Sequence, residues 1–292
     1  MILSWKWMSC VALSAVVIPM ATHAAQPTVS GGAPLVQPTV SAIPGSIVDT
    51  HRQMAMHDPA RLFETALARY DQTIDDYTAV FSIQEKLGRT LTPQREIVVK
   101  FKDEPFSLAM HWIRNPDRAR RMIYVQGLHR DSRGRKQCLV QPEGALARLL
   151  VPTIKIRLDS DEARETSRQG IEQFGFKRLL EMIVSVNARA ADRGELTLKY
   201  TGTSVIDDRA TYTFERLLPY DSEHPYDPEN PQGAYPERKQ IIHLDQQWLL
   251  PLACFCYADD QGRDLLGSYI YRDVKLNTGL TEQDFTPAAN GM

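Results

Sequence analysis

The sequence predicts an α+β protein built on an antiparallel sheet. Three observations carry this prediction: apolar and polar residues alternate over four successive segments, short turns join these segments, and a helical apolar pattern precedes them. Alternation with a period of two indicates strands that bury one face, as antiparallel strands do. Hairpin-length connections argue against the long crossovers that parallel strands need, and so against a βαβ fold. The four segments are 77–86, 95–102, 106–113 and 119–126.

The folded part is expected to begin near Asp58. An aspartate followed by a proline is typical of a helix N-cap and the first helical position. Leu62, Ala66 and Tyr70 then recur at helical spacing. The pattern predicts a helix over 59–72 that packs on the sheet.

The second half of the chain repeats the order of helix and strands. A second helix is expected over 170–191, with a glycine just beyond its end. Residues 219–236 contain several prolines, and this proline density excludes regular helix or strand there. The role of this loop is left open. The further strands are expected at 196–200, 203–206, 210–217, 239–244, 249–257 and 269–275.

The N-terminus has the order of an export signal. Lys6 precedes an apolar run of about 12 residues, and small residues around Ala24 follow. Spanning a bilayer takes roughly 20 residues, so we expect cleavage near Ala24 and a periplasmic mature protein. The expected division is a signal peptide at 1–24, a disordered linker rich in Pro, Ser and Gly at 25–57, a single domain at 58–286 and a C-terminal tail at 287–292.

The charge and composition of the chain limit the classes of partner that we expect it to bind. The chain has a formal net charge of −2, and cleavage removes Lys6 and no acidic residue, which gives −3. Nucleic-acid binding needs a basic surface that releases counterions from phosphates. We therefore expect no nucleic-acid partner, and no motif in the sequence predicts a cofactor.

The mature chain has three cysteines, Cys138, Cys254 and Cys256. The last two are two apart on an expected strand, so they point to the same face. Three interpretations stay open: three buried reduced thiols, a disulfide between Cys138 and one of the pair, or a metal site that adds His243. The usual spacing of zinc-binding cysteines is missing, and no metal site is predicted.

Several stretches resemble a known family. Residues 99–107 (VKFKDEPFS), with Trp112 and the YVQG of 124–127, resemble the bacterial envelope family catalogued as domain of unknown function 1571. The similarity covers roughly residues 58–286. It implies a fold similar to that of periplasmic lipoprotein carriers: a curved antiparallel sheet, or incomplete β-barrel, wrapped around two or three helices. It implies no catalytic residue. The closing segments that share it are Asp245, 249–252, 269–271, 274–277 and 279–285.

The apolar face of this expected half-barrel is the candidate binding site. Aromatic rings and methionine adapt to irregular partners, and burial contributes about 25 cal/mol per Å² of apolar surface. We predict a hydrophobic ligand such as an acyl chain or a lipoprotein, although the same side chains are compatible with a filled core. The candidate residues are Phe81, Ile83, Val99, Phe101, Leu108, Met110, Trp112 and Tyr124.

Two other functions stay open. An envelope sensor or other protein-binding module would use sheet edges, which accept an added peptide strand. A hydrolase needs a nucleophile, a base or a metal, and the common motifs for these are missing. Glu85 and Glu96, expected to face each other across the first hairpin, are the remaining carboxylate pair. The sequence predicts no enzyme activity and no catalytic residue.

Overall fold

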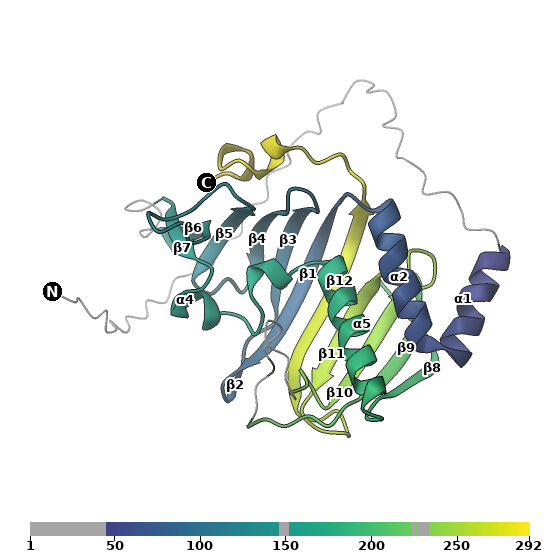
Figure 1. The fold of residues 1–292 in the computed structure, drawn as a ribbon. Coiled ribbons are helices and arrows are strands. Elements are labelled where there is room, and N and C mark those ends of the chain that lie inside the picture. The colour runs from purple at the N-terminus through teal and green to yellow at the C-terminus, as the bar shows by residue number, and fades with distance from the viewer. Residues whose placement is uncertain (1–44, 146–151, 224–225, 227–233) are drawn as a thin grey trace, which may run out of the picture. The chain divides into compact units, whose positions relative to one another are not determined.

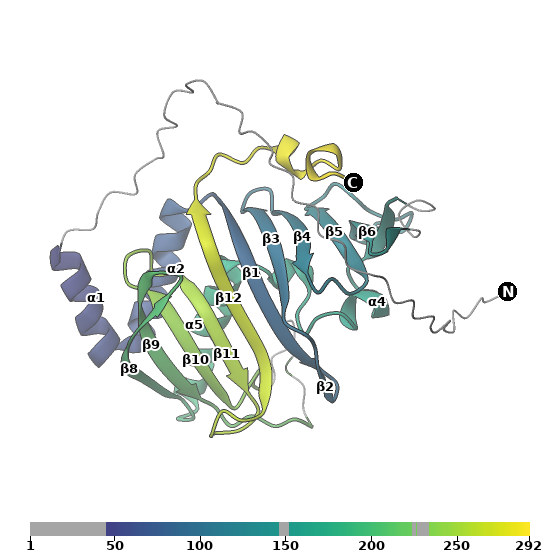
Figure 2. The same cartoon turned by 180° about the vertical axis from the view of Figure 1, so that it is seen from behind.

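The computed structural model describes residues 45–145, 152–223, 226 and 234–292. In this part of the chain, twelve strands form one antiparallel sheet (Figures 1 and 2). The strand order is β7-β6-β5-β4-β3-β1-β12-β11-β10-β9-β8, with β2 paired to β1 off this path. Two meanders thus meet where the last strand pairs with the first. The strands are β1 Asp76–Leu87, β2 Thr90–Leu91, β3 Arg95–Lys102, β4 Ser107–Arg114, β5 Ala119–Val125, β6 Gln137–Pro142, β7 Ile154–Arg157, β8 Thr197–Ile206, β9 Arg209–Leu217, β10 Lys239–Asp245, β11 Pro251–Tyr257 and β12 Leu265–Leu276.

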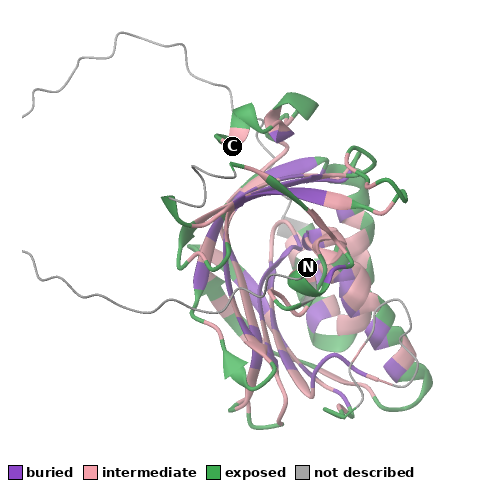
Figure 3. Cartoon of the chain, turned by 90° about the vertical axis from the view of Figure 1, so that its left-hand side faces the viewer, coloured by how far each residue is buried: buried purple, intermediate pink, exposed green. Residues whose placement is uncertain are grey.

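Helices α2 and α5 pack against each other on one side of the sheet, where α2 contacts β8 and α5 contacts β11. Figure 3 shows the sheet curved around this side, which we call the concave face. The end strands β7 and β8 do not pair with each other in the described residues. The helices are α1 Gly45–His57, α2 Pro59–Thr73, α4 Asp161–Arg164 and α5 Phe176–Asp192, and the 3-10 helices are η1 Ile171–Gln173, η2 Glu282–Phe285 and η3 Ala288–Asn290.

The predicted fold class is confirmed: an α+β protein in which a curved antiparallel sheet, an incomplete β-barrel, surrounds helices. The first predicted helix is α2. The Asp58 side chain caps it by accepting a hydrogen bond from the Arg61 amide at 3.2 Å. The predicted apolar stripe of α2, from Leu62 to Tyr70, is buried against the core.

The second predicted helix, 170–191, is divided into η1 and α5. Gly175 separates them with a φ of +110°, a conformation outside the helical region that favours glycine. The strands predicted at 196–200 and 203–206 are a single strand, β8, with an irregular register between Tyr200 and Gly202.

The structure corrects the expected linker, 25–57, because residues 45–57 form α1. Ala55 is fully buried, and the Tyr212 hydroxyl donates a hydrogen bond to the Val48 carbonyl at 3.3 Å. The few apolar residues of this segment predict disorder when it is considered alone. Packing against α2 and β8 gives these residues partners, and most helical stability comes from such packing.

The ends of the chain are only partly described. The expected signal peptide, 1–24, and residues 25–44 lie outside the described residues. The expected tail, 287–292, contains η3, and Met292 packs against the convex face of the sheet. Among the helices of the described residues, none has the length and apolar character to cross a membrane.

We predict that Gly175→Ala destabilises the protein by about 2 kcal/mol, because the left-handed backbone and a side-chain clash both oppose it. A Cβ at this position would lie 2.9 Å from the Phe101 ring and 3.2 Å from the Tyr77 hydroxyl oxygen. Gly170→Ala is the matched control, because a Cβ there meets nothing within 4 Å. Urea denaturation gives both free energies of unfolding, and equal values for the two variants would contradict this account.

Candidate functional site

The concave face of β1, β3, β4 and β5 brings together all eight residues of the predicted binding site. Directly opposite residues in a sheet share a face. Phe101 is opposite Leu108, which is opposite Tyr124, and Val99 is opposite Met110. The remaining three, Phe81, Ile83 and Trp112, belong to the same face, since Phe81 and Trp112 are both opposite Ile97 and Ile83 lies two residues from Phe81.

Burial divides these eight residues into two groups. Six are buried, while Met110 and Trp112 are half-buried against the same core. The buried group lies under the start of α5 and the segment before it. Phe101 stacks on Tyr77 with ring centroids 4.8 Å apart, and the Phe81 ring meets that of Phe174 edge-on at 5.2 Å. The buried aromatic residues therefore pack the helix onto the sheet.

The six buried residues are Phe81, Ile83, Val99, Phe101, Leu108 and Tyr124. Tyr124 is the one with a polar contact, since its hydroxyl donates a hydrogen bond to Glu172 Oε1 at 3.0 Å. Burial raises the pKa of Tyr124, and the nearby Glu172 carboxylate raises it further. The phenol thus stays protonated and acts as a donor.

The concave face changes from apolar to charged at one end. Glu85 continues the inward-facing series of β1, and Arg95 begins that of β3. The two side chains form a buried ion pair, with Arg95 Nη2 3.6 Å from Glu85 Oε2. The Tyr269 hydroxyl donates a hydrogen bond to Glu85 Oε1 at 2.9 Å. A buried charge is tolerated only with such partners.

A glycine makes the contact between Tyr269 and Glu85 possible. Gly267 of β12 is directly opposite Glu85, and a Cβ at Gly267 would lie 2.6 Å from the Tyr269 hydroxyl oxygen. The phenol therefore lies over the glycine to reach the carboxylate. Burial raises the pKa of Tyr269 far above its usual value, and the charge of Glu85 adds to this effect, so the hydroxyl remains a donor.

A second buried ion pair joins β9 to the segment just before β10. Arg216 is fully buried, and its Nη2 lies 2.6 Å from Glu237 Oε1. Its Nη1 donates to Asn187 Oδ1 of α5 at 3.0 Å. Arg168 links the two pairs, since its main-chain amide donates to Glu85 Oε1 at 3.3 Å and its Nη2 donates to the carbonyl oxygen of Pro236 at 3.1 Å.

Sequence reasoning missed this charged end. The available signal was the phase of the strands: Glu85 follows the inward-facing series 77, 79, 81 and 83, and Arg95 precedes 97, 99 and 101. Charged residues at inward positions predict either a strand end in solvent or a buried pair. The sequence alone does not distinguish these two cases.

The hypothesis that Glu85 and Glu96 face each other as the carboxylate pair of a hydrolase is wrong. Glu96 is opposite Ser82, and Ser82 and Glu85 lie on opposite faces of β1. On its own face, Glu96 accepts a hydrogen bond from Arg272 at 2.8 Å. The period-two geometry of the strand separates the two carboxylates, so they do not act on one substrate.

The three described cysteines are free and buried. Burial raises the pKa of both Cys138 and Cys254 to about 12, so these thiols are protonated and poor nucleophiles. No group of three or more His, Cys, Asp and Glu residues is arranged to hold a metal ion within the described ranges.

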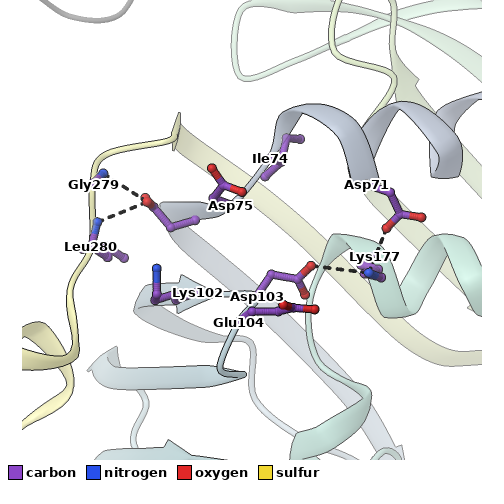
Figure 4. Close-up of a pocket in the computed structure, with 10 residues that line it drawn as sticks. Asp71, Ile74, Asp75, Lys102, Asp103, Glu104, Lys177, Gly279 and Leu280 are labelled. Carbon is purple, nitrogen blue, oxygen red and sulfur yellow. Dashed lines mark hydrogen bonds and ion pairs between the residues drawn. The ribbon is translucent and has the colours of Figure 1, made fainter.

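A separate polar pocket of about 570 Å³ lies where the C-terminal segment leaves β12 (Figure 4). Lys177 bridges two carboxylates in it, Asp71 at 2.8 Å and Asp103 at 3.4 Å. Asp76 is buried and accepts hydrogen bonds from the amides of Gly279 and Leu280 at 3.0 and 3.1 Å. The Lys177 contacts join α5 to α2 and to the turn between β3 and β4, and the Asp76 contacts join β1 to the C-terminal segment. This polar lining is unsuited to an acyl chain. The lining residues are Asp71, Ile74, Asp75, Asp76, Lys102, Asp103, Glu104, Lys177, Gly279 and Leu280.

Comparison with known families confirms the resemblance noted in the sequence. The family described as "Protein of unknown function (DUF1571)" matches residues 74–291. No curated protein sequence matches the chain.

Solved structures with similar folds differ widely in sequence. MucB shares 13% identity with a TM-score of 0.42 over 78% of this chain and 62% of its own. A chain of the MucA/MucB complex of Pseudomonas aeruginosa shares 13% identity with a TM-score of 0.43, over 80% of this chain and 62% of its own. The lipoprotein LppX of Mycobacterium tuberculosis shares 15% identity with a TM-score of 0.35, over 75% of this chain and 98% of its own. The chain thus spans about three fifths of MucB, and likeness at these TM-scores carries no functional conclusion.

We predict that Tyr269→Phe destabilises the protein by about 1–3 kcal/mol, because it leaves the buried Glu85 carboxylate without its hydroxyl donor. Tyr200→Phe is the matched control: Tyr200 is a half-buried tyrosine of β8 with no carboxylate partner in the described part of the chain. Chemical denaturation of both variants measures the difference. Equal losses would show that the Tyr269 hydroxyl contributes nothing specific.

Proposed function

We propose that this chain, which belongs to the DUF1571 family, is a periplasmic protein that binds a hydrophobic ligand on its concave face. The ligand is a lipid or a lipidated protein, and the protein acts by binding, without catalysis. One observation supports this most directly: two large apolar side chains of this face, Met110 and Trp112, stay half-buried beside a continuous apolar surface.

The neighbours of these two residues on the concave face are apolar and buried, so Met110 and Trp112 lie at the border of the core. Met110 lies between Val99 of β3 and Met122 of β5, and Trp112 is opposite Ile97. A guest that covers Met110 and Trp112 removes their exposed apolar area from water, which contributes about 25 cal/mol per Å². An acyl chain needs no precise polar geometry, which agrees with a surface of methionine and ring side chains.

The periplasmic location in this proposal depends on the export signal. That signal, 1–24, lies outside the described residues, so cleavage near Ala24 remains an expectation from the sequence. N-terminal sequencing of protein recovered from the periplasm tests it directly.

The second candidate function, binding of a protein partner, is favoured by the sheet edge. β8 ends the strand order, and its outer side pairs with no other strand in the described ranges. It runs for ten residues and exposes Val205 at 64%. A long unpaired edge with exposed β-branched residues accepts an added strand. Recovery of a protein rather than a lipid with the purified chain would favour this function.

We predict that Trp112→Ala weakens binding of a fluorescent acyl probe by roughly fivefold to tenfold, which corresponds to about 1 kcal/mol of lost apolar contact. Ile113→Ala is the matched control, because Ile113 is the next residue of β4, points to the opposite face and is 44% exposed. Fluorescence titration gives the affinities, and urea denaturation gives the stabilities.

Two results would count against lipid binding. One is a Trp112→Ala variant that loses stability and yet binds the probe as the natural protein does. The other is a purified mature protein that yields no lipid on extraction and takes up no acyl probe.

A further inference from the structure

The charged end of the concave face carries more positive than negative charge. It contains Arg95, Arg168 and Arg216 against Glu85 and Glu237, which sums to +1 among the described residues; we call these five residues the buried charge cluster. Four of the five are buried, and Arg168 is half-buried. An excess charge out of water is costly unless a partner compensates it.

Donor groups of the cluster remain unused. The Nε atoms of Arg95 and Arg216 are buried and have no hydrogen-bond partner in the described structure. Nδ2 of Asn187, which contacts Arg216, is also buried without a partner. A planar guanidinium presents its N–H groups in a fixed fork that matches carboxylate and phosphate oxygens. Two buried acceptors, Glu85 Oε2 and Gln240 Oε1, also have no hydrogen-bond partner in the described structure. The preference for an anion therefore rests on the excess of guanidinium groups over carboxylates, together with their unused N–H groups.

The cluster continues the apolar surface directly. Arg95 is the inward-facing residue that precedes Ile97 on β3, and Ile97 is opposite Trp112. Arg95 is also opposite Ile83 of β1. Along the concave face, apolar side chains are thus followed directly by guanidinium groups.

We propose that the buried charge cluster binds the anionic head group, a carboxylate or a phosphate, of the hydrophobic ligand. This inference rests on the proposed function and specifies it: the ligand is an acidic amphiphile whose tail contacts Met110 and Trp112. Arg168, the half-buried member, meets the head group. Glu85 and Tyr269 hold Arg95 and Arg168 in position through the contacts described above.

The test compares three probes of twelve carbon atoms each: dodecyl phosphate, dodecanoate and dodecanol. Calorimetric titration of the mature protein is expected to show both anions binding at least tenfold more tightly than the alcohol. Arg168→Gln is expected to reduce this preference to threefold or less, because it weakens the binding of both anions. Arg133→Gln, an exposed arginine of the loop between β5 and β6, is the matched control and keeps the full preference.

The outcomes separate this inference from the proposed function. If no probe binds, hydrophobic binding itself fails. If all three bind equally, or if Arg168→Gln keeps the preference, the protein binds a hydrophobic chain but the head-group inference is wrong. Inorganic phosphate is tested last, as a competitor. Weak competition with dodecyl phosphate and no competition with dodecanol support the proposal. Inorganic phosphate that binds as tightly as dodecyl phosphate overturns it in favour of a free-anion site.

Discussion

The pairing of β12 with β1 is the interaction on which the rest of the structure depends. These strands are the last and the first of the sheet, and their ladder joins the two meanders. The same register places Gly267 opposite Glu85, so the Tyr269 hydroxyl reaches the buried carboxylate. At the other end of the ladder, the Asp76 carboxylate accepts hydrogen bonds from the chain that leaves β12.

The concave face combines two demands that conflict in an ordinary core. One part is a dense aromatic layer. The ring centroid of Tyr77 lies 4.8 Å from that of Phe101 and 4.8 Å from that of Phe176. The other part holds buried ion pairs, although replacing such pairs by apolar residues is often neutral or stabilising. A fold that needed only stability would have no reason to bury Arg216 and Glu237 together. The other pair, Glu85 and Arg95, lies next to Ile97 and so beside the half-buried Trp112, and this adjacency is the physical basis on which we infer an acidic amphiphile as ligand.

Individual strands and helices show which parts of the fold can be predicted from the sequence. The strand predicted at 95–102 is β3, residue for residue, because it alternates strictly and has one wet face. β6 was not predicted, since it is buried on both faces and therefore does not alternate. Leu139 on its convex side packs with Phe285 of the C-terminal segment, a contact between residues far apart in the chain. Likewise, α1 lacks a continuous apolar stripe, and packing on α2 and β8 stabilises it.

The sequence alone determined the fold class, the inward phase of each alternating strand, the eight apolar residues of one face and the family. Local periodicity fixes the strands, their inward phase and the shared face, because side-chain direction in a strand follows from position, whereas the family follows from the resemblance of particular stretches such as 99–107. Only the tertiary structure decided which apolar residues α5 covers and which stay half-exposed, and that Glu85 pairs with Arg95 while Glu96 lies on the other face. These outcomes depend on strand register and on the curvature of the sheet, which join residues as far apart as Glu85 and Tyr269 and leave no periodic signal in the chain.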